Sequence, residues 1–401
     1  MKAKAFILGG YVNGLGLVRS LARIGVRSVV FDVTNSIAGN SRWASAVRCP
    51  HPANDTSAFL QSLLSASAKE PEPPVVFTTN DVWLIPVLEN EDLLRPSLRL
   101  PMSSWEVASA CYDKWRLTQL AQHHGIPTPR TFRVDSPNEL RQLEGHVPYP
   151  AILKPVDTIG FMEAMRRRSR SIRLESPGDL RATATALERA GLHSRALIVQ
   201  EFVPGGTEEL FTYTSYSNGE GRVLAWSVGH KIRQWPAQAG TITAGRVIRN
   251  EEVERIGEAL IQAVGFHGIA NTEFKRDTRT GEFKLIEINP RPGMWNRSAL
   301  ATGVNLPAMA YLEATGATLE RSGTTDQSVV WVNTFVDAFH AMRNHAPGTQ
   351  PLGPGGWWRS LEGKKVDAVF DASDPMPFVA HCVASFARLV RRRPAANGHQ
   401  L

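Results

Sequence analysis

The chain contains little cysteine and no long apolar run. Its three cysteines, Cys49, Cys111 and Cys382, are odd in number and far apart in a chain of 401 residues. This argues against a disulfide framework or a zinc site and is typical of a reducing compartment. No stretch reaches the roughly 20 apolar residues of a membrane-spanning helix, and the N-terminus lacks the cleavage site of a signal peptide. We therefore expect a cytoplasmic protein without a transmembrane segment.

Several short signatures of nucleotide and hydrolytic chemistry are also missing. The sequence has no G-x-x-x-x-G-K-[ST] phosphate loop, no G-x-S-x-G elbow, no H-E-x-x-H helix and no kinase H-R-D motif. Each of these motifs places a particular group against phosphate, metal or nucleophile. If the chain binds a nucleotide, it uses another arrangement of residues.

Acidic residues are the minority, since 45 Lys and Arg stand against 38 Asp and Glu, a net charge of +7. Part of the excess lies in two basic clusters, at 166–173 and 388–393. Such a balance can indicate nucleic acid, anionic lipid or phosphate-bearing ligands, but no RNA- or DNA-binding motif accompanies it. We expect no nucleic-acid partner, and we assign the first cluster to nucleotide phosphates and the second to a solvated tail.

The N-terminal segment predicts a doubly wound α/β domain. An apolar run at 4–8 is followed by a glycine-rich turn, a helical pattern at 17–24 and a second apolar strand at 28–32, which is the usual start of such a domain. Arg19 occupies the third position of a G-x-G-x-x-G fingerprint, so nicotinamide binding is weakly indicated, although Asp32 keeps it open. Tight turns that pack a helix on a sheet explain these glycines at least as well.

With 42% apolar residues and 10 Trp, the chain can fill several cores. We expect an α/β fold with four parts: an N-terminal doubly wound (Rossmann-like) domain at 1–110, a central subdomain at 111–203, a second subdomain at 204–320 and a C-terminal extension at 321–401. Among the elements, one helix is expected at 107–124, a strand at 329–335 and a mobile basic loop at 157–171. The amphipathic helix at 378–390 either touches a membrane surface or, as we favour, docks on the protein's own body.

A hairpin at 270–294 is the segment that is hardest to explain as scaffold. Strands at 270–275 and 283–289 flank a turn rich in Asp, Thr and Gly. Side chains alternate along a strand, so one face of the second strand should carry four residues: Phe283, Leu285, Glu287 and Asn289. A hairpin symmetric about Thr280 places Glu273 opposite Glu287.

Opposed side chains on neighbouring strands lie about 4.5–5.5 Å apart, and like charges placed so are destabilising. Glu273, Glu287 and the amide oxygen of Asn289 make sense there if a hard cation such as Mg²⁺ lies between them. A solvated hairpin face with scattered charges is the alternative. Pro290 and Pro292 end the strand where Asn289 and Arg291 would project into a cleft, which favours the metal site.

At these residues the chain resembles the ATP-grasp superfamily, over roughly 112–305. Glu273 followed by the E-I-N-P-R run at 287–291 is similar to the pattern of carbamoyl phosphate synthetases and related carboxylate–amine ligases. The run GHKIRQWPAQAGT at 229–241 looks more like the D-aspartate ligase branch.

The resemblance implies roles for particular residues. Glu273, Glu287 and Asn289 would hold one or two Mg²⁺ (or Mn²⁺) at the ATP phosphates. The nucleotide contacts would be Lys114 and Lys154 at the phosphates, Glu201 and Val203 at the adenine, and Glu208 at the ribose, with Glu209 as its competitor. For Lys154 a solvated strand end is the alternative.

The same resemblance assigns catalysis and substrate binding. Arg291 would stabilise charge on the transferring phosphoryl group. Asn271 stands where some ligases place an arginine, and Lys231 and Arg233, alternating onto one strand face, would fill that gap. We assign Arg233 to the substrate acid or the acyl phosphate, with a surface charge as the alternative. Trp235, Trp295 and Asn296 either line the acceptor pocket or belong to the packing.

We therefore expect an ADP-forming ATP-grasp ligase that joins a small carboxylic acid and an amine, including amino acids, through an acyl phosphate. The sequence is compatible with a homodimer. The alternatives are a nicotinamide-dependent oxidoreductase that uses the N-terminal glycines, an ATP-grasp carboxylase or kinase-like enzyme, and a nucleotide-binding protein without catalysis.

Overall fold

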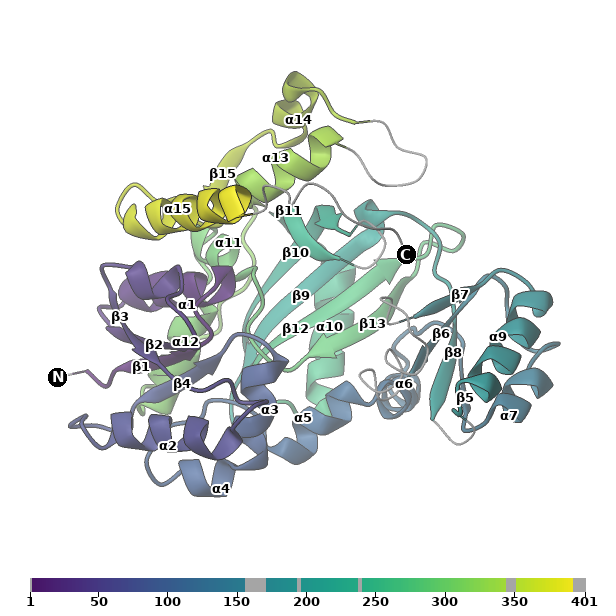
Figure 1. Cartoon of the computed structure of the whole chain (residues 1–401), viewed down its shortest axis with the longest axis horizontal. Coiled ribbons are helices and arrows are strands. Elements are labelled where there is room, and N and C mark those ends of the chain that lie inside the picture. Colours follow the sequence, from purple (N-terminus) through teal and green to yellow (C-terminus); the bar gives the residue numbers. More distant parts are fainter. Residues whose placement is uncertain (1, 156–170, 193–195, 237–239, 344–350, 392–401) are drawn as a thin grey trace.

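The computed structural model describes residues 2–155, 171–192, 196–236, 240–343 and 351–391, with side chains to 384. Three sheets organise these residues (Figure 1). The predicted basic loop lies outside the described residues except for its last residue, Ser171. The side chains of the second basic cluster lie outside them as well.

The first sheet is parallel and has the strand order β3-β2-β1-β4. Its elements are β1 (Ala5–Leu8), α1 (Val12–Ala22), β2 (Ser28–Asp32), the short helix η1 (Ala38–Asn40), β3 (Ala44–Arg48), α2 (Thr56–Ser67), β4 (Val75–Thr78), α3 (Asp81–Glu89) and α4 (Glu91–Leu94). Alternate residues of β1 enter two different cores: Ile7 packs with α1, and Phe6 packs with α2 and α3. Helices therefore cover both faces of this sheet.

The predicted helix at 107–124 is wrong as one element, because it divides into α5 (Trp105–Tyr112) and α6 (Lys114–His123). Asp113 lies between the two helices and accepts hydrogen bonds from the backbone N–H groups of Trp115 and Arg116, both at 3.0 Å. Aspartate is favoured at such an N-cap. The break places Lys114 at the first position of α6.

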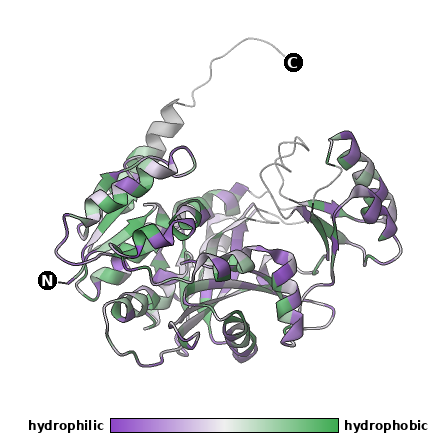
Figure 2. Cartoon of the chain, turned by 90° about the horizontal axis from the view of Figure 1, so that it is seen from below, coloured by the Kyte–Doolittle hydropathy of each residue, from purple (hydrophilic) through white to green (hydrophobic). Residues whose placement is uncertain are grey.

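The smallest lobe contains a four-stranded sheet of order β5-β8-β6-β7 with two helices on it. Its elements are β5 (Thr131–Val134), α7 (Pro137–Gln142), β6 (Ala151–Pro155), β7 (Ile172–Leu174), α9 (Pro177–Arg189) and β8 (Leu197–Glu201). Leu180, Ala184 and Leu187 bury one face of α9, as the spacing of three and four residues predicts. The helices of this lobe carry both hydrophilic and hydrophobic residues in Figure 2.

The largest sheet has seven strands in the order β13-β12-β9-β10-β11-β14-β15. Its strands are β9 (Leu210–Ser217), β10 (Val223–Trp235), β11 (Thr241–Ile248), β12 (Gly268–Arg276), β13 (Phe283–Asn289), β14 (Val329–Val332) and β15 (Lys364–Asp367), and its helices are η2 (Thr207–Glu209), α10 (Glu251–Val264), α11 (Asn296–Ala301), α12 (Leu306–Ala314), α13 (Thr334–Arg343) and α14 (Pro354–Ser360). Only β14 and β15 pair in parallel. Because both come from the C-terminal extension, that extension continues the sheet, and the strand predicted at 329–335 ends at Val332.

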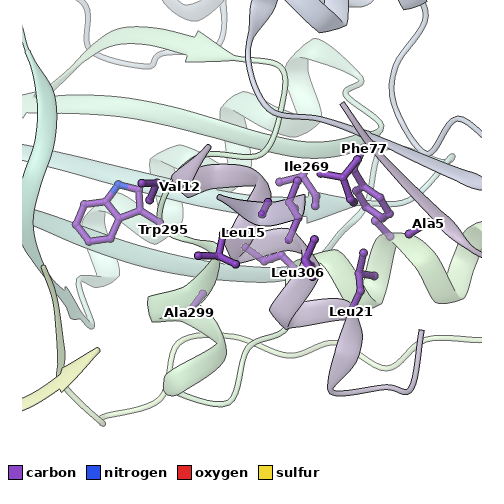
Figure 3. Packing of buried hydrophobic residues seen from close by; sticks show 14 of the residues in the cluster. Ala5, Val12, Leu15, Leu21, Phe77, Ile269, Trp295, Ala299 and Leu306 are labelled. Carbon is purple, nitrogen blue, oxygen red and sulfur yellow. The ribbon is translucent and has the colours of Figure 1, made fainter. Parts of the chain in front are cut away.

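The N-terminal domain docks on one end of this large sheet. Val12, Leu15 and Leu21 of α1 pack with Ile269 of β12 and Leu306 of α12 (Figure 3). The opposite face of the sheet is covered by α10, whose Val253, Ile256 and Leu260 are buried. Along β12, Ile269, Asn271 and Glu273 point to the same side. The N-terminal domain packs on Ile269, and the polar side chains of Asn271 and Glu273 lie farther along this face of the sheet.

The C-terminal helix α15 (Met376–Arg391) lies against the body of the protein. Phe378 stacks on Phe335 with ring centroids 5.5 Å apart, and Asp374 just before the helix forms an ion pair of 3.1 Å with the buried Arg19. These contacts confirm the docking that we favoured. Within the described ranges, no helix has both the length and the apolar character needed to cross a membrane.

Candidate active site

The register of the hairpin β12–β13 is the predicted one at its polar end. Glu273 pairs with Glu287, and Asn271 pairs with Asn289. The register shifts between Glu273 and Phe274, since Phe274 pairs with Leu285. The two carboxylates therefore lie opposite each other, as the sequence predicts.

The bulge corrects the predicted face of β13. Leu285 and Ile288 lie in the core beneath the sheet, with Phe283 packed against them, so Glu287 and Asn289 point to the other side. The prediction that all four alternate residues share one face is wrong, because the extra residue of a bulge reverses the alternation. The apolar side chains are thereby kept out of the polar site.

The carboxylate pair has well-defined neighbours. Lys231 Nζ lies 3.0 Å from both carboxylate oxygens of Glu273, and Asn289 Nδ2 donates to Glu287 Oε1 at 3.0 Å. Burial, together with the charge of Glu287, raises the pKa of Glu273, while Lys231 opposes the rise. Burying the two like charges side by side thus costs free energy in the free protein, and a bound cation would offset that cost.

These donors fit Mg²⁺. Among the described residues, no group of three or more His, Cys, Asp and Glu could hold a metal ion, and the predicted set is instead two carboxylates and the Asn289 amide oxygen. Mg²⁺ accepts such a set, since it commonly takes one or two carboxylates and fills its octahedron with water and phosphate oxygens.

Two lysines flank the carboxylates. Lys154 at the end of β6 donates to Gln200 Oε1 at 3.0 Å. Burial, followed by the charge of Lys114, lowers the pKa of Lys154 to about 8, and the charge of Glu287 opposes this. Lys114 of α6 and Glu287 of β13 are therefore both near enough to act on Lys154 of β6. Gln200 was not predicted from the sequence.

Glu201 and Val203, the predicted adenine contacts, lie in the segment that connects the small sheet to the large one. The Glu201 side chain already has hydrogen-bond partners. It accepts hydrogen bonds from the backbone N–H of Arg130 at 3.1 Å, from Lys284 at 3.2 Å and from Arg279. Burial opposes ionisation, yet these donors lower the pKa of Glu201. Val203 offers its carbonyl to Lys275 Nζ at 2.8 Å. Any adenine contact of Glu201 would therefore use its backbone.

The two acids of η2 are in different surroundings. Glu209 is buried and accepts two hydrogen bonds from Arg276, at 2.6 and 3.2 Å. Glu208 is exposed, and its carboxylate accepts one from the backbone N–H of Gly206 at 3.2 Å. This difference favours Glu208 as the ribose ligand.

Arg291 joins the hairpin to the N-terminal domain. Its guanidinium donates to both carboxylate oxygens of Asp81, at 2.6 and 3.3 Å, and to Asn289 Oδ1 at 3.1 Å. The Tyr112 hydroxyl donates to Asp81 Oδ1 at 2.7 Å. Asp81 and Tyr112 were not among the predicted site residues, and the one signal in the sequence is that Asp81 opens a helix after a strand.

Arg233 does not share a face with Lys231, so that prediction is wrong. The pairing of β10 with β11 shifts register twice between Lys231 and Gln234, and Lys231 Nζ approaches Gln234 Oε1 at 3.4 Å. Arg233 instead points to Asp337 of α13, with distances of 2.6 to 3.1 Å, and to Ser360 at 2.7 Å. Its predicted role in substrate binding is not supported by these contacts.

The aromatic candidates lie mainly in packing positions. Trp295 is buried over Gly229 and Gly245, where added Cβ atoms would lie 2.6 and 2.3 Å from its ring. Trp235 stacks on His340 with centroids 4.0 Å apart. Asn296 donates to the Gly293 carbonyl at 2.6 Å.

The glycine-rich turn of the N-terminal domain is closed by its own residues. Asp32 accepts hydrogen bonds from the backbone N–H groups of Gly10, at 2.8 Å, and Val33, at 2.7 Å. Asn13 bridges the carbonyls of Thr79 and Pro292, both at 2.8 Å. These contacts serve turn and domain packing, which argues against the nicotinamide alternative.

Comparisons with known proteins agree with this geometry. The family described as "ATP-grasp in the biosynthetic pathway with Ter operon" matches residues 224–335. D-aspartate ligase of Enterococcus faecium (strain Aus0004) is 25% identical over 215 residues, 51% of this chain and 50% of that protein. D-alanine–D-alanine ligase B of Chromobacterium violaceum is 27% identical over 208 residues, 50% of this chain and 63% of that one. The chain thus spans about half to two thirds of the length of these curated relatives.

Solved structures share the fold. L-amino acid ligase from Bacillus licheniformis has a TM-score of 0.58 at 18% identity, covering 79% of this chain and 75% of that chain. N5-carboxyaminoimidazole synthetase from Staphylococcus aureus has a TM-score of 0.61 at 16% identity, covering 80% of each.

The chain shares its fold with these ligases and matches an ATP-grasp family over residues 224–335. Together these similarities support an ATP-grasp protein of the carboxylate–amine ligase type.

Proposed function

We propose that the protein is an ATP-dependent ligase that joins a small carboxylic acid to an amine. The observation that carries the proposal is the opposed pair Glu273 and Glu287 with Asn289 and Lys231, together with Lys154 of β6, which is close enough to be affected by the charge of Glu287. Two carboxylates and an amide oxygen could bind a divalent cation, and two lysines could bind the phosphates of a nucleoside triphosphate. The parallel N-terminal sheet would be the doubly wound domain that precedes an ATP-grasp core.

In the proposed reaction, an oxygen of the substrate carboxylate attacks the γ-phosphorus of ATP, and the bond to the β-phosphate oxygen breaks to release ADP. The amine then attacks the acyl carbon of the acyl phosphate, loses a proton and displaces inorganic phosphate to form an amide. The protein needs no covalent nucleophile, since positioning and electrostatic stabilisation carry such a transfer.

The residues divide this work. Lys114 and Lys154 would bind the phosphates, Lys231 and Arg291 would stabilise charge at the transferring group, and Glu208 would bind the ribose. Glu273, Glu287 and Asn289 would hold Mg²⁺, which when bound neutralises phosphate charge. Backbone groups of Glu201 and Val203 would meet the adenine.

Amino acids are the substrates that we propose first. Relatives with this fold are a D-aspartate ligase, a D-alanine–D-alanine ligase and an L-amino acid ligase. A cytoplasmic location and a homodimer are part of the same proposal.

The test is a screen of pairs of amino acids and small acids for joint release of ADP and phosphate with amide formation. Glu287→Gln should abolish the turnover, while Glu282→Gln, at an exposed position in the turn of the same hairpin, should leave it unchanged. Turnover by the Glu287 variant at the native rate would refute the metal assignment. Reduced nicotinamide formed with a 2-hydroxy acid would instead support the oxidoreductase alternative.

A further inference from the structure

A continuous series of hydrogen bonds leads from the hairpin into the N-terminal domain. Asn289 Nδ2 donates to Glu287 at 3.0 Å, and Arg291 Nη2 donates to Asn289 Oδ1 at 3.1 Å. Arg291 also holds Asp81 with two bonds, and the Tyr112 hydroxyl donates to Asp81 at 2.7 Å. Each hydrogen bond in the series restricts the orientation of the side chains that it joins.

The series determines which way the Asn289 amide faces. A carboxylate only accepts and a guanidinium only donates, so Nδ2 must face Glu287 and Oδ1 must face Arg291. A carbonyl oxygen has two acceptor positions. With Arg291 in one, the other remains for a cation at the same site as Glu287.

Arg291 needs a support of its own. It follows β13 in a proline-flanked segment, and its side chain is 17% exposed. Without Asp81, a flexible guanidinium beside two carboxylates would be free to pair with Glu287 and neutralise it. The bidentate contact of Asp81, itself held by Tyr112, keeps the Arg291 charge directed away from that carboxylate.

We propose that Asp81, supported by Tyr112, is a positioning residue through which the N-terminal domain orients Arg291 and the Asn289 amide oxygen toward a divalent cation. This inference rests on the proposed function, because it concerns the cation of the same nucleotide site. The alternative is that Asp81 and Arg291 only join two parts of the fold. The two explanations differ in what happens to cation affinity.

Asp371 offers a matched control. Its carboxylate accepts from Arg297 Nη2 at 2.7 Å, with side chains 20% and 11% exposed. This pair also joins separate elements, and neither residue belongs to the proposed site. Asp371→Asn therefore removes an equivalent charge and ion pair without touching the hairpin.

The experiment measures Mn²⁺ binding by electron paramagnetic resonance with the full chain and saturating ADP. Partners of metal ligands commonly change metal affinity by about 10- to 100-fold, and we expect Asp81→Asn to weaken Mn²⁺ binding by about tenfold. Tyr112→Phe should weaken it less, and Asp371→Asn should not weaken it. Thermal melting of each variant gives the fraction folded.

Native Mn²⁺ affinity in both the Asp81 and the Tyr112 variants would overturn the inference, as would equal losses in the Asp81 and Asp371 variants. If Asp81→Asn does not fold, Tyr112→Phe alone decides. A wild-type protein that binds no Mn²⁺ with ADP would overturn this inference and the proposed function together. A protein that shows the expected Mn²⁺ losses but ligates no acid to any amine contradicts the proposed function alone.

Discussion

Lys231 Nζ lies equidistant, at 3.0 Å, from the two carboxylate oxygens of Glu273. The lysine is 5% exposed and the glutamate 20%, so this ion pair is largely removed from water. Glu273 therefore has an ionic partner in the free protein, and Lys231 is fixed beside the carboxylate that we propose as a metal ligand.

Replacing Lys231 by Gln should reduce both stability and turnover. Breaking a buried pair leaves an uncompensated charge, which costs about 3 kcal/mol, and the pKa of Glu273 should rise further. We expect a lower melting temperature and a loss of ADP formation of at least about 100-fold, the size seen for one electrostatic stabiliser. Saturating Mg·ADP should restore part of the melting temperature. Undiminished turnover would exclude Lys231 from catalysis.

Nucleotide binding should depend on pH through Lys154. Its pKa of about 8 in the free protein means that it carries a proton below pH 8 and loses it above. Phosphate oxygens favour the charged lysine, so ATP affinity should fall above pH 8, by at most about tenfold per pH unit. Calorimetry in buffers of different ionisation enthalpy should detect proton uptake on binding near pH 8. In Lys154→Met that uptake should disappear, and its persistence would assign the proton to another group.

Periodicity and turn chemistry predicted the elements that position the site. The strand Phe283–Asn289 has the predicted bounds, because the Gly-containing turn before it is a local signal. The bulge next to Glu273 and the two register shifts after Lys231 are set by pairing with other strands. Alternation within one strand cannot reveal them.

The long-range partners were also beyond the sequence. Asp81 and Arg291 are 210 residues apart in the sequence, and no local sequence pattern around either residue predicts their contact. The same holds for Arg233 and Asp337, which are 104 residues apart. Charge types gave candidates for the site, while the fold decided which of them meet.

Arg233 should prove to be structural. Asp337 is fully buried and accepts hydrogen bonds from Arg233, from Thr243 at 2.7 Å and from Trp357 at 2.8 Å. Among these three donors only Arg233 is charged, so Arg233→Gln leaves the buried Asp337 carboxylate without its ionic partner. This should cost about 3 kcal/mol of stability. The KM values of both substrates should stay near native in the folded fraction, and Asp337→Asn should behave alike. A selective rise in the KM of the acid would return Arg233 to the binding site.

The choice between Glu208 and Glu209 can be decided with a nucleotide analogue. A hydrogen bond to a charged group contributes about 1.5–3 kcal/mol, so Glu208→Gln should raise the KM for ATP by about tenfold or more. With 2′,3′-dideoxy-ATP, which lacks the ribose hydroxyls, wild type and variant should differ little. Glu209→Gln should leave both nucleotides unaffected and lower stability by about 1 kcal/mol or less, because its partner Arg276 is half exposed. If Glu209→Gln instead raises the KM for ATP, Glu208→Gln does not, and neither changes the KM for the analogue, the ribose is assigned to Glu209, and Arg276 must release it.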